Sequence, residues 1–110
     1  LITEEELEKV SASTMVGGAT LTKLLGTSAW YAPGASVAFL VKSILNDEKR
    51  IIPCSVFLDG EYNQDDICIG VPCIIGKNGC EKIINLKLND QEMVKFADSA
   101  SAVRKMNLAL

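Results

Sequence analysis

The four cysteines are the residues of this sequence best suited to bind a metal or to react, and they stand at positions 54, 68, 73 and 80. Zinc is usually held by Cys-x-x-Cys pairs or by cysteines together with histidines. No two of these cysteines have that spacing, and the chain contains no histidine. Cys54 alternates with apolar residues, and Cys68 and Cys73 lie in or beside another apolar run. We therefore expect no metal site and expect most of the cysteines to be reduced, buried thiols.

The lack of histidine also removes the Ser-His-Asp and Cys-His arrangements and a histidine general base. Asp65 and Asp66 are adjacent in an expected turn, which favours a solvated loop over a catalytic carboxylate pair. The segment GVPCIIGKN resembles a phosphate loop only superficially, because five residues separate its glycines where four are required, and Asn78 replaces Ser or Thr. No G-x-G-x-x-G fingerprint is present. The sequence therefore lacks a complete catalytic apparatus.

Length and charge narrow the possible partners. The chain has 110 residues, 48% of them hydrophobic, which is typical of a single domain. Its 14 acidic and 11 basic residues are interspersed, which argues against nucleic acid as a partner. No apolar run approaches the roughly 20 residues that span a bilayer, and the acidic start lacks the basic region of a secretion signal. We expect a cytoplasmic protein without membrane contact, and a fragment of a longer protein, because a helix begins almost at the first residue, which is Leu.

A second stretch that invites a functional interpretation is LLGTSAWYAPGAS, residues 24–36, which contains the only tryptophan of the chain. Trp30 and Tyr31 stand side by side in a loop between two expected helices. Large aromatic side chains usually lie in a core or at a contact surface, and the residue types alone do not choose between them. The stretch also lies at the amino-terminal end of a helix, where amide groups favour anions.

The expected helices position this loop. The first begins at Thr3, which forms a capping-box pattern with Glu6, and continues to about Leu25, where Gly26 can end it. Gly17-Gly18 in its middle indicates a kink or the close approach of another backbone, in preference to a ligand contact. Its apolar stripe consists of Leu7, Val10, Thr14, Gly17 or Gly18, Leu21 and Leu24 or Leu25.

A second helix is expected from about residue 30 to residue 46. Either Ser28 or Ala29 caps it, or residues 29–31 are extended and Pro33 lies in its first turn. Three strands follow, at residues 51–58, 67–75 and 83–88, separated by Asp59-Gly60 and GKNG turns. Asn89 and Glu92 then cap a last helix. The buried stripe of that helix is expected to contain Met93, Phe96, Ala97, Ala100 and Val103.

These elements predict an α+β fold in the order ααβββα, with helices packed on a three-stranded antiparallel sheet. The segments GGATLTKLLGTSAWYAPGAS, KRIIPCSVFLDGEY, DICIGVPCIIGKNGCEKIINLKLNDQE and ADSASAVRK resemble, in this order, the carboxy-terminal part of the lactate/malate dehydrogenase family. The resemblance is to its NAD-dependent malate dehydrogenases, because lactate members usually have Thr-Ser-Trp where this chain has residues 29–31. It implies that residues 1–110 are the end of the substrate-binding domain and that the Rossmann NAD-binding domain is absent from this chain.

The resemblance also implies a function and a division of roles. The full-length enzyme would reversibly oxidise malate to oxaloacetate with NAD, in the tricarboxylic acid cycle, as a dimer or tetramer. Its catalytic His and Asp and its substrate-binding Arg would precede residue 1, so the chain alone is expected to be inactive and to bind NAD weakly. Ser28 and Ala29 would line the substrate pocket, and Pro33 would pack near the nicotinamide ring.

Trp30 and Tyr31 are expected to hold the loop in the core or in a subunit interface, in preference to substrate contact. Without its Rossmann domain the chain should also expose apolar surface. Two alternatives stay open: a fragment of a lactate dehydrogenase or of another 2-hydroxy acid dehydrogenase, and a structural or oligomerisation module with no activity of its own.

Overall fold

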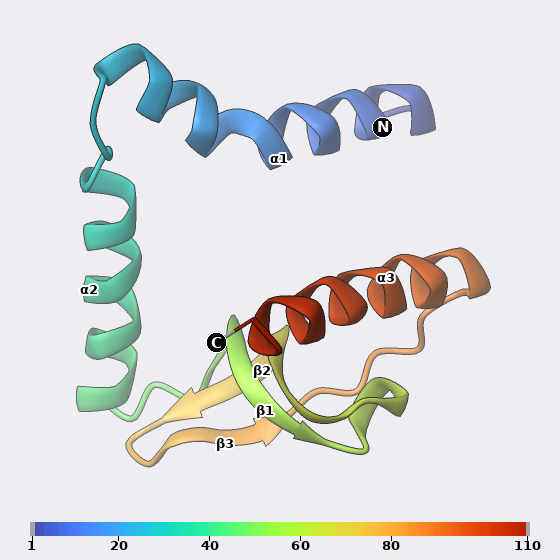
Figure 1. Ribbon diagram of the computed structural model, residues 1–110. Coiled ribbons are helices and arrows are strands. Elements are labelled where there is room, and N and C mark those ends of the chain that lie inside the picture. The colour runs from blue at the N-terminus through green and yellow to red at the C-terminus, as the bar shows by residue number, and fades with distance from the viewer. Residues whose placement is uncertain (1, 110) are drawn as a thin grey trace. The chain divides into compact units, whose positions relative to one another are not determined.

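The structure is a computed structural model that describes residues 2–109, and its chain divides after Ala38 into two compact units. The first unit holds α1 (Glu4–Leu25) and the start of α2 (Tyr31–Leu45). The second holds the rest of α2 and all later elements: β1 (Arg50–Asp59), a short helix η1 (Glu61–Asn63), β2 (Asp65–Gly76), β3 (Gly79–Ile83) and α3 (Asp90–Asn107) (Figure 1). The predicted fold class and the order ααβββα are confirmed.

Helix α1 has the ends that its sequence predicts. The Thr3 hydroxyl accepts a hydrogen bond from the Glu6 amide at 3.2 Å, and the Glu6 carboxylate accepts one from the Thr3 amide at 2.8 Å. Gly26 ends the helix with φ 70°, a left-handed conformation that glycine adopts without strain. A Cβ placed on Gly17 or Gly18 would meet no atom within 4 Å, so nothing in the first unit approaches them closely. The expected close approach is therefore not made within that unit, and for contacts beyond it the approach stays a prediction.

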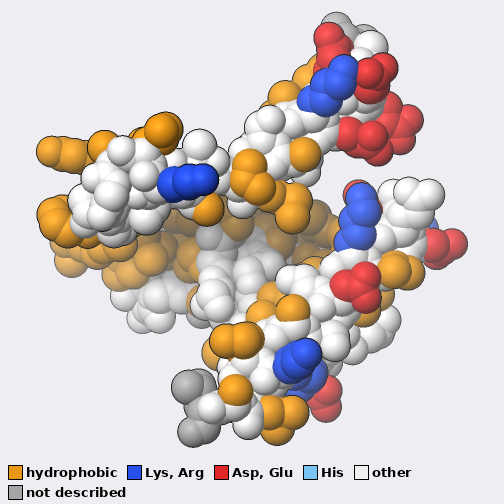
Figure 2. All heavy atoms as spheres, turned by 45° about the horizontal axis from the view of Figure 1, so that its top comes forward, with side chains coloured by type: hydrophobic (Ala, Val, Ile, Leu, Met, Phe, Trp, Pro, Cys, Tyr) orange, Lys and Arg blue, Asp and Glu red, His pale blue; other side chains and the backbone are white. Residues whose placement is uncertain are grey.

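The apolar stripe of α1 is not covered within the first unit. None of the residues of α1 is buried, and Leu7, Val10 and Leu21 are all exposed. Figure 2 shows hydrophobic side chains on much of the surface in view. The chain thus exposes apolar surface, as expected of a piece of a larger protein.

The second unit buries its own core between the sheet and α3. The strands are antiparallel in the order β1-β2-β3, and Figure 1 shows α3 lying across the sheet. Residues of β2 alternate between the two faces, and its inner face is formed by Ile67, Ile69, Val71, Cys73 and Ile75. Leu58 of β1, Tyr62 of η1 and Ala100 of α3 complete the buried hydrophobic set. Leu40 and Ile44 of α2 pack against it.

The third strand differs from its predicted position. It covers Gly79–Ile83 in place of the expected 83–88, and the chain leaves the sheet after the Ile84 amide, which donates to the Pro72 carbonyl of β2 at 2.9 Å. The cause is Tyr62, which is 6% exposed and has a left-handed backbone with φ 53°. Its hydroxyl donates to the Ile84 carbonyl at 2.5 Å and accepts from the Leu86 amide at 3.0 Å. These backbone groups are therefore satisfied by a side chain from η1 and need no strand partner.

The prediction for the cysteines holds for only part of the set. All four are free thiols, and Cys73 is fully buried while Cys54 is half-buried. Cys68 and Cys80 are exposed, so the expectation that most cysteines are buried is wrong. Cys68 lies on the outer face of β2, because its position in the strand alternates with those of the buried residues. Burial, with smaller effects of Cys80 and Cys54, raises the pKa of Cys73 to about 11.

Helix α3 is capped as predicted, with a hydrogen bond of 2.9 Å from the Glu92 amide to the Asn89 side chain. Ala100 is its one buried residue, and Ala97 is exposed, which corrects one member of the predicted stripe. The other members are half-buried: Met93, Phe96 and Val103. The Phe96 ring lies 5.1 Å from the Tyr62 ring, centroid to centroid, so α3 also supports Tyr62.

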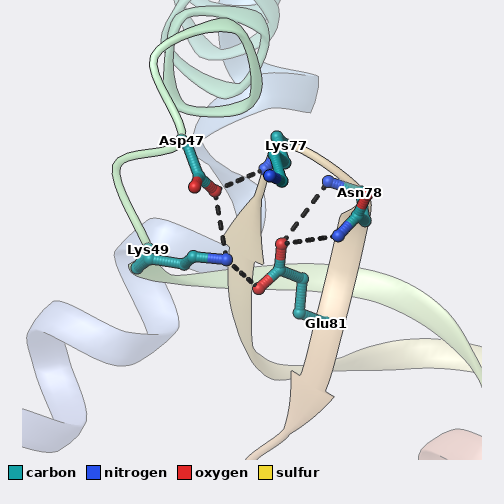
Figure 3. Close-up of polar contacts among 5 residues, drawn as sticks. All are labelled: Asp47, Lys49, Lys77, Asn78 and Glu81. Carbon is teal, nitrogen blue, oxygen red and sulfur yellow. Dashed lines mark hydrogen bonds and ion pairs between the residues drawn. The ribbon is translucent and has the colours of Figure 1, made fainter.

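A polar cluster joins the turn after α2 to the β2–β3 hairpin (Figure 3). The Asp47 carboxylate accepts from the Lys77 amide at 2.8 Å, and this hydrogen bond, assisted by Lys49, lowers the pKa of Asp47. Lys49 pairs with Asp47 at 3.1 Å and with Glu81, which raises the pKa of Lys49. Lys49, aided by the Asn78 amide, lowers the pKa of Glu81. The cluster links the segment before β1 to the β2–β3 hairpin.

Candidate functional site

A pocket of about 420 Å³ lies within the first unit. It is formed by one face of α1, by the loop that follows and by the first two turns of α2. Its lining residues are Gly18, Leu21, Thr22, Ser28, Ala29, Ala32, Pro33 and Ser36. It is the candidate site because it brings together Ser28, Ala29 and Pro33, the three positions that the sequence singles out.

Local sequence explains how the loop leads into α2. The Gly34 amide donates to the Trp30 carbonyl at 2.8 Å, so the hydrogen bonds of the helix begin at Trp30. Pro33 lies in the first turn, where amides have no partner within the helix, and its missing N–H therefore costs no hydrogen bond. Neither Ser28 nor Ala29 caps the helix, and Pro33 lies in its first turn, as the second of the two expected helix starts has it; the helix begins at Tyr31, however, so residue 31 is not extended.

The lining of the pocket determines what it can do chemically. Its polar side chains are the hydroxyls of Thr22, Ser28 and Ser36, and none of its residues is charged at neutral pH. Hydroxyls donate and accept hydrogen bonds, but unaided they do not exchange protons near pH 7. The pocket can therefore shape, hydrogen-bond and partly desolvate a ligand, while proton transfer requires groups that this lining does not contain.

The two aromatic residues at the loop, Trp30 and Tyr31, are not placed to contact a ligand in this pocket. Trp30 is 72% exposed and Tyr31 is 93% exposed, and neither lines the pocket. The expectation that they hold the loop in the core is wrong for the described chain, because the loop reaches its conformation with both side chains in solvent. Their alternative placement in a subunit interface stays a prediction.

Five lining residues were not predicted as part of a site: Gly18, Leu21, Thr22, Ala32 and Ser36. A signal for them exists in the spacing. Gly18, Leu21 and Thr22 are separated by three and four residues and so share one face of α1. Ala32 and Ser36 lie three and seven residues after Ala29, which places them on one face of α2. Nothing local indicates that these two faces meet.

Two further classes of site were sought. Within residues 2–109, no group of three or more Cys, Asp or Glu side chains is arranged to hold a metal ion. Over the same range, no helix combines the length and the apolar character needed to cross a bilayer. The pocket beside the loop therefore remains the candidate functional site of the described residues.

The fold belongs to a known class of domain. A family model described as the lactate/malate dehydrogenase alpha/beta C-terminal domain matches residues 1–107. The chain therefore belongs to the lactate/malate dehydrogenase family, as its C-terminal domain. This confirms the family predicted from the sequence.

Within the family, the relatives are malate dehydrogenases. The chain is 73% identical over 109 residues to the malate dehydrogenase of Flavobacterium frigidimaris, and 68% identical to that of Bacteroides thetaiotaomicron. These matches cover 99% of this chain but 35% of each relative. The crystal structure of malate dehydrogenase from Salinibacter ruber is 42% identical with a TM-score of 0.92, and covers 96% of this chain and 34% of that one. The chain thus spans about a third of the length of its relatives.

Proposed function

We propose that this chain forms one wall of the substrate pocket of a malate dehydrogenase, which interconverts malate and oxaloacetate with NAD. The observation that carries the proposal is the convergence of Ser28, Ala29 and Pro33 on one pocket, in a chain whose relatives are malate dehydrogenases. The two thirds of the relatives that this chain does not match would supply the NAD-binding domain and the residues that move the proton.

In this proposal the loop acts by shape. Ala29 is a small residue in the wall, and the space beside it accommodates the carboxymethyl group that distinguishes malate from lactate. The Ser28 hydroxyl lines the same pocket and can donate a hydrogen bond to a substrate oxygen. Exclusion of water by this wall strengthens the ionic contacts made by residues outside the chain.

The residues present fit only one end of the cofactor. NAD, when bound, accepts the hydride from carbon 2 of malate. Pro33 offers an apolar ring in an uncharged pocket, which suits contact with a flat nicotinamide ring. The sequence holds no glycine-rich turn for the cofactor phosphates, so their binding is assigned to the part of the protein beyond this chain.

The proposal is tested by the turnover of the full-length protein, followed through the absorbance of NADH with oxaloacetate or pyruvate as substrate. We expect turnover with oxaloacetate, and turnover with pyruvate alone would contradict the proposal. Ala29→Thr should lower kcat/KM for oxaloacetate roughly tenfold, because one added group in a pocket has about that effect. Ala35→Thr, in α2 but outside the pocket lining, is the matched control. The isolated chain should show no turnover.

Assembly and location are part of the same proposal. The exposed apolar side chains of α1, such as Leu7 and Val10, would contact the remaining domain or a second subunit of a homo-oligomer. Four free cysteines suit a reducing compartment such as the cytoplasm, where the tricarboxylic acid cycle of a bacterium operates. Light scattering of the full-length protein measures its mass in solution, and a monomer would contradict the assembly proposed.

A further inference from the structure

The α1 side of the pocket contains a position that has no side chain. Gly18 lines the pocket together with Leu21 and Thr22, which follow it on the same face of the helix. Glycine is among the least favourable residues in a helix interior, so stability of α1 does not explain its presence. No backbone of the first unit approaches it closely enough to require a glycine either.

The neighbouring glycine differs from Gly18 in one respect. A Cβ on either Gly17 or Gly18 would meet no atom within 4 Å, and neither residue has a left-handed backbone. Gly18 lines the pocket, whereas Gly17 does not. Successive residues of a helix point about 100° apart, so a side chain at position 17 is directed away from the pocket. A side chain at position 18 would instead extend into its volume of about 420 Å³.

We propose that Gly18 is a specificity-determining position, whose missing side chain sets the depth of the pocket and so the size of the 2-hydroxy acid that it accepts. The inference rests on the proposed function and adds α1 to the loop as a determinant of substrate choice. This wall of the pocket carries no charge, so its effect on substrate choice comes from its hydroxyls and from the space that small residues leave, and Gly18 provides that space on the α1 side.

The test is a pair of matched series in the full-length protein: Gly18→Ala and Gly18→Leu against Gly17→Ala and Gly17→Leu. Both series replace a helical glycine by a better helix former, so changes in helix stability are shared. One extra carbon in a pocket changes kcat/KM by about tenfold or more, so we expect Gly18→Ala to lower kcat/KM for oxaloacetate roughly tenfold and Gly18→Leu roughly a hundredfold. The loss should appear in KM for oxaloacetate, with KM for NADH unchanged. The Gly17 series should stay within about twofold of the unsubstituted enzyme, since its side chains lie outside the pocket.

Three outcomes overturn the inference. The first is an equal loss in the two series, because the effect would then come from the helix and not from the pocket. The second is a rise of KM for NADH in place of KM for oxaloacetate in the Gly18 series. The third is an active Gly18→Leu enzyme with unchanged kinetics. If circular dichroism shows that Gly18→Leu is unfolded, the smaller Gly18→Ala change decides. Absence of oxaloacetate turnover in the unsubstituted enzyme contradicts the proposed function itself, which separates the two failures.

Discussion

Replacing Tyr62 with Phe should loosen the segment that follows β3. The substitution removes one hydroxyl and keeps the ring that packs against Phe96. The hydroxyl donates to the Ile84 carbonyl at 2.5 Å and accepts from the Leu86 amide at 3.0 Å, in a residue that is 6% exposed. A hydrogen bond contributes a net ~1 kcal/mol, and its loss costs more when the partner stays buried. Two lost bonds therefore cost about 2 kcal/mol.

Hydrogen exchange followed by mass spectrometry measures this change locally in the full-length protein. A cost of about 2 kcal/mol corresponds to roughly thirtyfold faster exchange of the Leu86 amide. Tyr31→Phe is the matched control, because it makes the same chemical change at a side chain that is 93% exposed. Equal exchange of residues 84–88 in the two variants would refute the argument that the Tyr62 hydroxyl directs this segment out of the sheet.

Two further predictions concern the polar cluster. In Gly76→Ala the new Cβ would lie 2.6 Å from the Glu81 carboxylate and 2.7 Å from that of Asp47, so both side chains must move and the Lys77 and Asn78 amides should exchange faster. Gly70→Ala, on the same strand with no atom within 4 Å, should leave these amides unchanged, and equal effects would contradict the prediction. Lys49→Met should return the pKa of Glu81 most of the way to its ordinary value of 4.5, because Lys49 is the main cause of its lowering. The same substitution should raise the pKa of Asp47 less, because the hydrogen bond from the Lys77 amide remains. Carboxyl NMR titration measures the two pKa values. Equal changes at Glu81 and Asp47 would contradict the assignment of Lys49 as the main cause at Glu81 and the Lys77 amide as the main cause at Asp47. The pKa values of both carboxyl groups are lowered, so their contribution to the stability of the fold is complete above about pH 4.5. That contribution is lost as the pH falls through the lowered pKa values. Since the pKa of Lys49 is raised above 10.5, its contribution is complete below that pH and is lost only as the pH rises through the raised value.

The parts of the fold that follow from sequence are those decided by neighbours in the chain. Thr3 with Glu6, and Asn89 with Glu92, satisfy amides three residues away, so the capping pattern suffices to place both helix starts. Gly26 ends α1 through its own backbone freedom. The hairpin between β2 and β3 is equally local, because Lys77 and Asn78 form its two-residue turn.

The errors arise where a distant residue decides. Residues 84–88 have the apolar pattern of a strand, but the hydroxyl of Tyr62, more than twenty residues earlier, bonds the Ile84 carbonyl and the Leu86 amide. The sequence around residues 84–88 contains no trace of this partner, so a local pattern cannot predict the outcome.

The candidate pocket likewise combines residues that the sequence predicts with residues that only the folded chain brings together. Ser28, Ala29 and Pro33 belong to one short segment, and a resemblance to a known family is enough to single them out. Gly18 and Thr22 join them only because the left-handed turn at Gly26 and the loop after it bring one face of α1 to the start of α2. That convergence is a property of the folded unit, and it adds a helix to a site that the sequence assigns to a loop.

The distribution of buried residues has a consequence for this pocket. The second unit buries a core of its own around β2, whereas no residue of α1 is buried and Leu21, in the pocket lining, is 44% exposed. Burial of apolar surface is the main favourable term in folding, so the first unit gives α1 little of the stabilisation that the core gives the second unit. The candidate pocket lies entirely in the unit that lacks a core of its own. We therefore expect the sheet and α3 to persist in the isolated chain while α1 exchanges its amides rapidly. Equal protection of α1 and β2 in that chain would show that the pocket wall is held by the chain alone.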